Sequence, residues 1–193
     1  MLFSEYIDSH YEIINYNHAI AILKHDFPEQ FNDIIDVLNA FVLKKTDILE
    51  PGGRKSLIAE SLDSHFTALG WVEKKFETQL VIDGEIYNTP THKIDCVKGR
   101  VALEIEWNNK DPFFDRDLTN FRILHERNAI SVGVLITRTS ELQSIFNVLE
   151  KGSSYGNSTT HLGKLKPRID GHASGSCPVL VFAIKPSLYD ENR

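Results

Sequence analysis

The fold is decided by the stretch KIDCVKGRVALEIEWNN at residues 93–109. On both sides of Lys98-Gly99, apolar residues alternate with polar or charged ones, which predicts two strands joined by a tight turn. Glu104 and Glu106 are two positions apart, so they project from the same face of the second strand. Asp95 lies on the first strand. The stretch therefore predicts a hairpin that carries three carboxylates.

The predicted register brings these acids close together. With Lys98-Gly99 as the two turn residues, Asp95 pairs with Ala102 and lies diagonally across from Glu104, about 7–8 Å away between backbones. Two carboxylates at that separation can bind one hard cation, and oxygen ligands favour Mg²⁺ or Mn²⁺ over Zn²⁺. Without a cation, converging acids repel one another. The alternative is that they alternate onto the solvated face of a half-exposed hairpin, a common pattern in strands.

Residues before this stretch predict helices and a further hairpin. Residues 31–41 and 57–69 carry apolar side chains at helical spacing, the first after Pro28 and the second ending at Gly70. The apolar period then changes to two. Residues 76–82 and 85–88 flank Asp83-Gly84, a strong signal for a type I′ hairpin.

Residues after it predict a helix over 115–127 and a strand over 130–137. A second helix is opened by a capping box of Ser140 and Gln143 and ends near Gly152. A polar stretch over 152–176 is predicted to be a loop, and 178–185 to be an apolar strand. The order of elements predicts one α/β domain over 1–193, with a mixed β-sheet flanked by helices, a core over 57–185 and a helical N-terminal segment over 1–50.

The composition is that of a soluble globular protein, with 41% hydrophobic and 25% charged residues. No run approaches the roughly 20 apolar residues that span a bilayer, and Met1–Glu5 lacks the features of a secretion signal, so we expect a cytoplasmic protein without membrane contact. Cys96 and Cys177 are too few for a disulfide framework. The net charge of −6 resides in residues 1–50, whereas residues 151–176 carry +3, which is compatible with DNA binding.

The sequence resembles the BglII/BstYI type II restriction endonucleases of the PD-(D/E)XK nuclease superfamily. The resemblance extends from Leu57 to Ile184. Its landmarks are ALGW at 68–71, Asp95 with VALEIEWNN at 101–109, VGVLI at 132–136 before the helix from Glu141, and PVLVF at 178–182. Most of the superfamily has Lys at the position of Glu106, and BglII and BstYI have Gln. Glu at this position is similar to BamHI, a more distant relative.

The resemblance implies a restriction-endonuclease-like fold and a homodimer that cuts both strands of double-stranded DNA at a short palindrome, with a GATC core as a weaker expectation. It implies Mg²⁺ as cofactor, with Mn²⁺ able to substitute, held by Asp95, Glu104 and the backbone carbonyl of Ile105. Glu106 would orient or deprotonate the attacking water. Glu60, in the middle of the helix before the hairpin, could hold a second metal ion, although a solvated helix residue is the simpler interpretation.

Sequence recognition is expected from side chains near the ends of the strands and from the polar stretch, because amide and guanidinium groups read base edges and cations contact phosphates. The candidates are Asn108, Asn109, Arg138, Thr139, Ser153, Ser154, Tyr155, Asn157, Ser158, Thr159, Thr160, His161, Lys164, Lys166 and Arg168. A flexible surface segment is the alternative for the polar stretch.

Two other functions stay open at the level of sequence. A repair or recombination nuclease, such as a junction resolvase, would share the fold, but usually carries Lys at the third position and a more basic surface. A non-catalytic DNA-binding or protein-interaction domain would place the acids on its surface.

Overall fold

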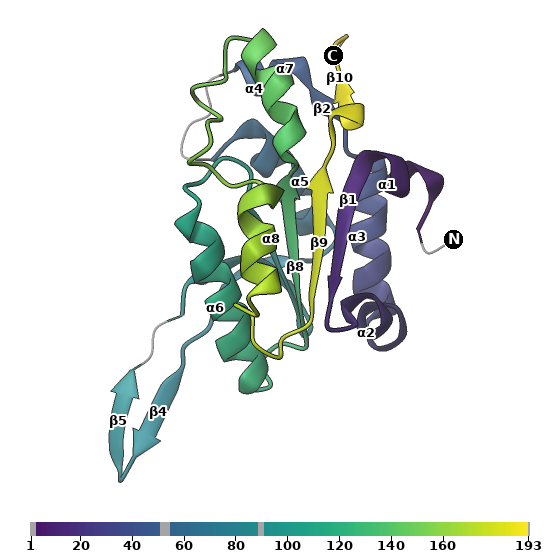
Figure 1. Ribbon diagram of the computed structural model, residues 1–193. Helices are drawn as coiled ribbons and strands as arrows, with labels where there is room; N and C mark the ends of the chain where they lie inside the picture. The colour runs from purple at the N-terminus through teal and green to yellow at the C-terminus, as the bar shows by residue number, and fades with distance from the viewer. Residues whose placement is uncertain (1–2, 51–54, 89–90, 193) are drawn as a thin grey trace.

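A mixed six-stranded sheet forms the centre of the protein (Figure 1). The computed structural model describes residues 3–50, 55–88 and 91–192. In spatial order the strands are β1 (Tyr11–Tyr16), β9 (Val179–Ile184), β8 (Val132–Arg138), β7 (Val101–Ile105), β6 (Lys93–Lys98) and β3 (Val72–Lys75). β7, β8 and β9 are parallel to one another, and the other pairs are antiparallel. The predicted mixed sheet flanked by helices is confirmed.

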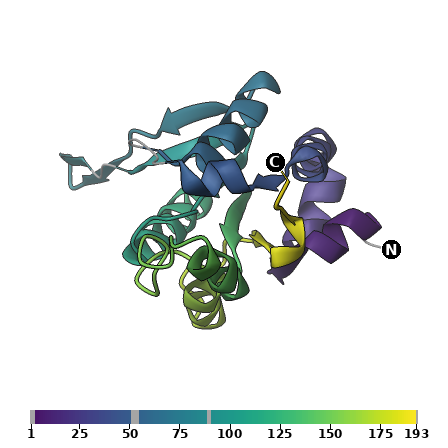
Figure 2. The ribbon, with the colours of Figure 1, turned by 90° about the horizontal axis from the view of Figure 1, so that it is seen from above.

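Helices cover both faces of this sheet, which Figure 2 shows from above. One face packs on α2 (Ala19–Asp26), α3 (Pro28–Ala40) and α5 (Leu57–Ala68), and the other on α6 (Pro112–Glu126) and α8 (Leu162–Asp170). The two cores follow the alternation of strand side chains. In β7, Leu103 and Ile105 face the α5 side, whereas Ala102 faces the α6 side. Glu104 and Glu106 alternate with Leu103 and Ile105, so they point toward α6.

Smaller elements complete the fold. They are α1 (Glu5–His10), α4 (Lys45–Leu49), α7 (Gln143–Val148), the 3₁₀ turns Ser140–Leu142 and Pro186–Leu188, the parallel pair β2 (Leu43–Lys44) and β10 (Tyr189–Asp190), and the hairpin of β4 (Gln79–Ile82) and β5 (Glu85–Asn88). This hairpin projects from the body of the molecule (Figure 1). In the described part of the chain, no helix is long and apolar enough to cross a membrane.

The two hairpins compare differently with their predictions. Asp83 and Gly84 form the turn between β4 and β5 with φ of 51° and 86°, as a type I′ turn requires, so this prediction is confirmed. In the second hairpin the predicted register is wrong. Lys98 pairs with Val101, so the two turn residues are Gly99 and Arg100. Gly99 has a φ of 60°, and it takes the first turn position, which accepts glycine in type II′ turns.

The stretch 152–176 is not the continuous loop that the sequence predicts, because it contains α8. Leu162, Leu165 and Ile169 form the buried face of this helix at helical spacing. Gly163 and Pro167 made a helix hard to predict from the sequence, since both residue types usually interrupt helices. The predicted capping box is also wrong. The amide of Gln143 donates to Asn147 Oδ1 and to the carbonyl of Gly152 at the far end of α7.

The N-terminal segment contributes a strand that the sequence did not predict. β1 pairs along its whole length with β9 and forms one edge of the sheet. Its neighbour α3 begins at Pro28 and buries Phe31, Ile34, Val37 and Leu38, which confirms the predicted helix. Residues 3–50 thus belong to the same sheet and core as the residues that follow them.

Close approach of α6 to the sheet depends on Gly133 in β8. A Cβ atom built at this position would lie 2.6 Å from Cε2 and 2.8 Å from Cγ of Phe121, far inside van der Waals contact. We therefore predict that Gly133→Ala lowers the free energy of unfolding by about 2–3 kcal/mol, as overpacked core positions do. Urea denaturation followed by circular dichroism measures this change. Gly156→Ala is the control, because its Cβ would meet nothing closer than 3.5 Å. Equal stability of the two variants would contradict the prediction.

Candidate active site

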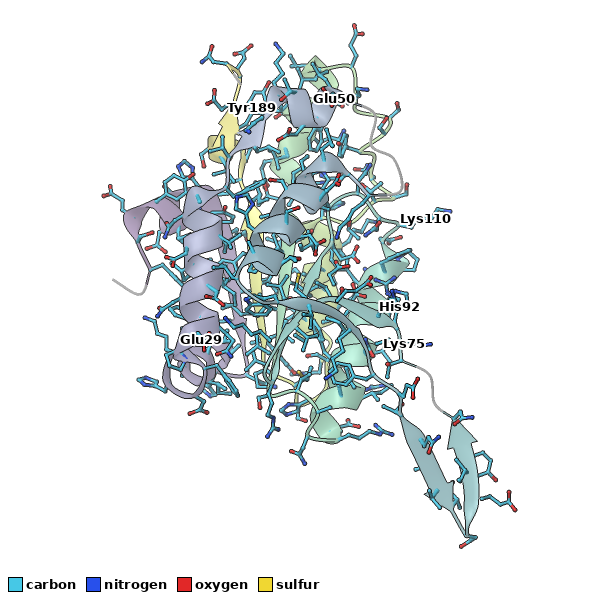
Figure 3. The ribbon with its side chains drawn as sticks, turned by 180° about the vertical axis from the view of Figure 1, so that it is seen from behind. Glu29, Glu50, Lys75, His92, Lys110 and Tyr189 are labelled. Carbon is cyan, nitrogen blue, oxygen red and sulfur yellow. The ribbon has the colours of Figure 1, made fainter. Side chains whose placement is uncertain are left out.

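Asp95 and Glu106 lie in a pocket of about 810 Å³ between the end of the β6–β7 hairpin, α5 and α6. Glu50 and His92, both labelled in Figure 3, belong to its lining and lie well apart along the molecule. Lys55, Arg116 and Asn109 also line the pocket. Carboxylates and cations therefore meet in a cavity large enough for a segment of a polar ligand.

The observed register places Asp95 directly opposite Glu104, because Cys96 pairs with Leu103 and Val97 with Ala102. Beyond the Cys96–Leu103 pair, the carboxylates of Asp95 and Glu104 accept hydrogen bonds from the opposite backbone in place of backbone carbonyls. The Asp95 N–H donates to Glu104 Oε2 at 3.1 Å, and the Ile105 N–H donates to Asp95 Oδ2 at 3.0 Å. On its other side β7 remains paired with β8. Each carboxylate thus takes one hydrogen bond from the opposite strand.

These exchanges leave one oxygen of each carboxylate for a ligand. Glu104 is 1% exposed, and its Oε1 has no hydrogen-bond partner among the described residues. Burial, followed by the negative charges of Asp117 and Asp95, raises the pKa of Glu104 well above its ordinary value. Burial also raises the pKa of Asp95, against the opposing effects of the Ile105 N–H and the positive charge of Lys55. Such a buried, charged pair requires protons or a cation.

Two neighbours hold the carboxylate of Glu106, and a third group, Asp117, places a negative charge beside it. Asn109 Nδ2 donates to its Oε2 at 2.7 Å, and Arg116 Nη2 lies 3.2 Å from its Oε1. Burial and the negative charge of Asp117 raise the pKa of Glu106 to about 9. Asp117 is fully buried and binds the same guanidinium at 2.7 Å, and burial raises its pKa to about 6 despite Arg116. Glu106 is therefore a far stronger base than an exposed glutamate.

Sequence reasoning missed Arg116 and Asp117. A signal was present, because Asp117 occupies an interior position of α6 between the buried residues Phe114 and Phe121. An acid on the apolar stripe of a helix points to a buried partner. The partner itself, Glu106, comes from another element, and the sequence does not reveal which face of α6 meets β7.

The site residues fit a divalent cation. In the part of the chain that the structure describes, no three His, Cys, Asp or Glu side chains gather as a metal-binding group. Two carboxylates suffice for Mg²⁺, which usually keeps several waters and phosphate ligands. Asp95 Oδ1 and the unpartnered Oε1 of Glu104 are the available oxygens of the facing pair. Glu60 does not join them, because it is exposed on α5 and lies outside the pocket lining.

Several predicted DNA contacts are buried. Arg138, Thr139, Tyr155 and Thr160 are at most 6% exposed. Arg138 Nη2 donates to the Tyr155 carbonyl and to Thr159 Oγ1, and its guanidinium lies 5.2 Å from the centre of the Phe146 ring. The prediction that Arg138 reads a base is therefore corrected. Its guanidinium fixes the shape of the loop, because its partners are a carbonyl and a hydroxyl of the loop. Thr139, Tyr155 and Thr160 are likewise too buried for a base contact.

The remaining candidates form the outer surface of the same region. Ser153, Ser154, Asn157, Ser158 and Lys166 are exposed, and Asn108, Asn109, Thr159, His161, Lys164 and Arg168 are half-buried. Two hydrogen bonds join the segment after β7 to this loop: the Asn109 N–H donates to Thr160 Oγ1, and the Thr160 N–H donates to the Asn109 carbonyl. Movement of the loop would therefore be transmitted to Asn109, which binds Glu106.

The predicted phosphate-binding cations of α8 have acidic partners. Arg168 makes two hydrogen bonds to the carboxylate of Asp115, at 2.7 and 2.8 Å. Lys164 lies 4.0 Å from Asp111, and Lys166 lies 3.4 Å from Asp170. DNA phosphates would compete with these carboxylates for the three cations.

Comparison with known proteins identifies a family. The sequence model described as restriction endonuclease BglII/BglIII matches residues 11–184. The matched range begins with β1 and ends with β9, so it includes the entire six-stranded sheet and the pocket. A search of curated proteins finds no match for the chain.

The raised pKa of Glu106 has a consequence for stability. A carboxyl group with a folded-state pKa of about 9 and an ordinary value of 4.5 takes up a proton on folding, so its contribution is complete below pH 4.5 and is lost as the pH rises toward 9. Glu106→Gln should remove this loss, since glutamine is neutral and can keep the bond from Asn109. In EDTA at pH 8 we predict a gain of about 1–3 kcal/mol in the free energy of unfolding.

Urea denaturation at pH 5 to 9 tests this prediction. The control is Asp115→Asn, because Arg168 lowers the pKa of Asp115 and its loss should reduce stability at neutral pH. A Glu106→Gln variant with the same pH dependence as the unmodified protein would contradict the assignment.

Proposed function

The chain belongs to the BglII/BglIII family of restriction endonucleases, and from this membership we propose that Asp95, Glu104 and Glu106 form its catalytic centre. A member of this family is a site-specific deoxyribonuclease and acts on double-stranded DNA. Enzymes of this kind generally use divalent metal ions. We propose Mg²⁺ as the ion, because the available ligands are oxygens, with Mn²⁺ as a substitute.

The proposed roles follow from the surroundings of each side chain. Asp95 and Glu104 would hold the ion through the oxygens that their backbone bonds leave available, together with the Ile105 carbonyl. A bound divalent ion supplies Lewis acidity, which offsets phosphate charge and lowers the pKa of a nearby water. Glu106 would accept a proton from the attacking water in its carboxylate form, which the charge of a bound cation would favour. The water oxygen would bond to phosphorus, one P–O ester bond would break, and the released oxygen would take a proton from solvent. Asn109 and Arg116 would orient Glu106 during this transfer.

One observation carries the proposal: the buried Glu104 has an oxygen without a partner in the described structure, within the field of three other carboxylates, those of Asp117, Asp95 and Glu106. Burial of an unpaired carboxylate is very unfavourable, and a structural glutamate would use both oxygens. A cation at this position would satisfy Glu104 and would also bind a phosphate. The alternative of surface acids without catalytic function does not explain this burial.

The remaining features of the proposed enzyme concern its assembly and specificity. Two subunits would cut the two strands of a palindrome, so we propose a homodimer that acts in the cytoplasm, and a recognition sequence with a GATC core. The exposed polar groups Ser153, Ser154, Asn157 and Ser158, with Asn108 beside the pocket, are the proposed sources of base and phosphate contacts.

Asp95→Asn tests the metal-binding role. We predict that the purified protein with Mg²⁺ cuts plasmid DNA into discrete fragments, that EDTA stops the reaction, and that the variant loses at least about 10³-fold in cleavage rate. Duplex binding by the variant should persist or strengthen, because a negative charge facing the phosphate is removed. Gel electrophoresis with end mapping, and fluorescence anisotropy with the mapped duplex, measure the two effects.

Glu60→Gln is the matched control, since Glu60 is exposed and outside the pocket lining; this variant should keep full activity. Cleavage that survives in Asp95→Asn would refute the assignment of Asp95. Smeared products or branch-selective nicking would favour a repair nuclease, and intact DNA would favour a binding domain.

A further inference from the structure

A positive side chain from outside the hairpin enters the candidate active site. Lys55 lies immediately before Ser56, the N-cap of α5, and lines the same pocket as Asp95. Its Nζ is 3.0 Å from Asp63 Oδ2, and 38% of its side chain is exposed. The other oxygen of Asp63 accepts a hydrogen bond from Cys96 Sγ at 3.4 Å. Asp63 thereby links the ammonium group to β6, one residue from Asp95.

The charge of Lys55 acts on Asp95. Burial alone would lower the pKa of Lys55, but the hydrogen bond to Asp63 and the charge of Asp95 outweigh it and raise the pKa. In return, Lys55 and Arg116 both oppose the raised pKa of Asp95. Lys55 precedes α5, whereas Arg116 belongs to α6. Two positive charges from different elements therefore act on Asp95.

Lys55 is one of the pocket-lining cations that keep N–H donors for a ligand. Arg116 uses Nε and Nη2 for Asp117 and Glu106. Lys93 is exposed and pairs with Glu73 at 2.6 Å. An ammonium group has three N–H donors, so its contact with Asp63 leaves donors for a phosphate. A phosphate that approaches Asp95 and Glu106 meets negative charge and needs such a donor.

We propose that Lys55 is a further catalytic residue, whose ammonium group binds the phosphate that is cleaved. This inference rests on the proposed function. Asp63 holds Nζ at the edge of the pocket, and a bound phosphate oxygen receives one of the remaining N–H groups. The positive charge offsets the charge that develops on the phosphate as water attacks, while Glu106 takes the proton.

The test is a double-mutant cycle: the charge of Lys55 and the charge of the phosphate at the cleavage position are removed singly and together, and binding is compared. Two duplexes carry the mapped cleavage site of this enzyme; in one of them a neutral methylphosphonate replaces the phosphate at the cleavage position. Dissociation constants are measured in EDTA, which gives a readout independent of turnover. We expect the ratio of the two constants, neutral over native, to be roughly tenfold lower in Lys55→Met than in the unmodified protein. Single-turnover cleavage of the native duplex should fall about 10²-fold.

Lys185→Met is the matched control, because Lys185 donates to the Asp8 carbonyl far from the pocket and its loss removes the same charge. The ratio in this variant should equal that of the unmodified protein. Lys55→Gln carries the same measurement if Lys55→Met does not fold, as judged by its thermal transition. An unchanged ratio in an active, folded Lys55 variant overturns the inference alone. An unmodified protein that does not cut DNA overturns the proposed function and this inference with it.

Discussion

The carboxyl groups of Glu104, Glu106 and Asp117 are buried, and burial together with the negative charge of Asp117 raises the pKa of both glutamates. The rest of the structure depends on compensating the unfavourable burial of these three acids. Removal of a carboxylate from water is strongly unfavourable unless hydrogen bonds, ions or protons compensate it. The protein supplies backbone N–H groups from the opened hairpin, the guanidinium of Arg116 and the amide of Asn109. Glu104 Oε1 and Asp117 Oδ2 have no partner among the described residues, so this compensation is incomplete. A divalent ion bound at Glu104 would add to it.

The sequence predicted strands β4 to β9 and the helices α3, α5, α6 and α7 because their patterns are local. The apolar runs of β8 and β9 identify strands that are covered on both faces of the sheet. The hairpin register was wrong by two residues, since glycine can occupy either position of a two-residue turn. Helix α8 was missed because Pro167 lies inside it. The pairing of Asp117 with Glu106 depends on how α6 packs on β7, which no local pattern encodes.

The loop over 152–161 illustrates how an interior residue can govern recognition without contacting the ligand. Arg138 ends β8 and binds the loop from beneath, while Tyr155 stacks on Phe146 at 4.2 Å between ring centres. The exposed serines and asparagine of the loop are therefore presented on a fixed support. Preorganisation of this kind lowers the entropy lost on binding, so a polar surface can derive its specificity from the buried aromatic and guanidinium groups beneath it.

The β4–β5 hairpin leaves the sheet after β3 and returns at β6, and all its strand residues are exposed (Figure 1). Among the strands that the structure describes, β4 and β5 pair with each other alone. The contacts that position Asp95 and Glu104 come from β7, α5 and α6. The hairpin is thus a modular appendage, whose length and sequence can diverge between relatives, or be exchanged by an engineer, while the catalytic geometry is inherited unchanged.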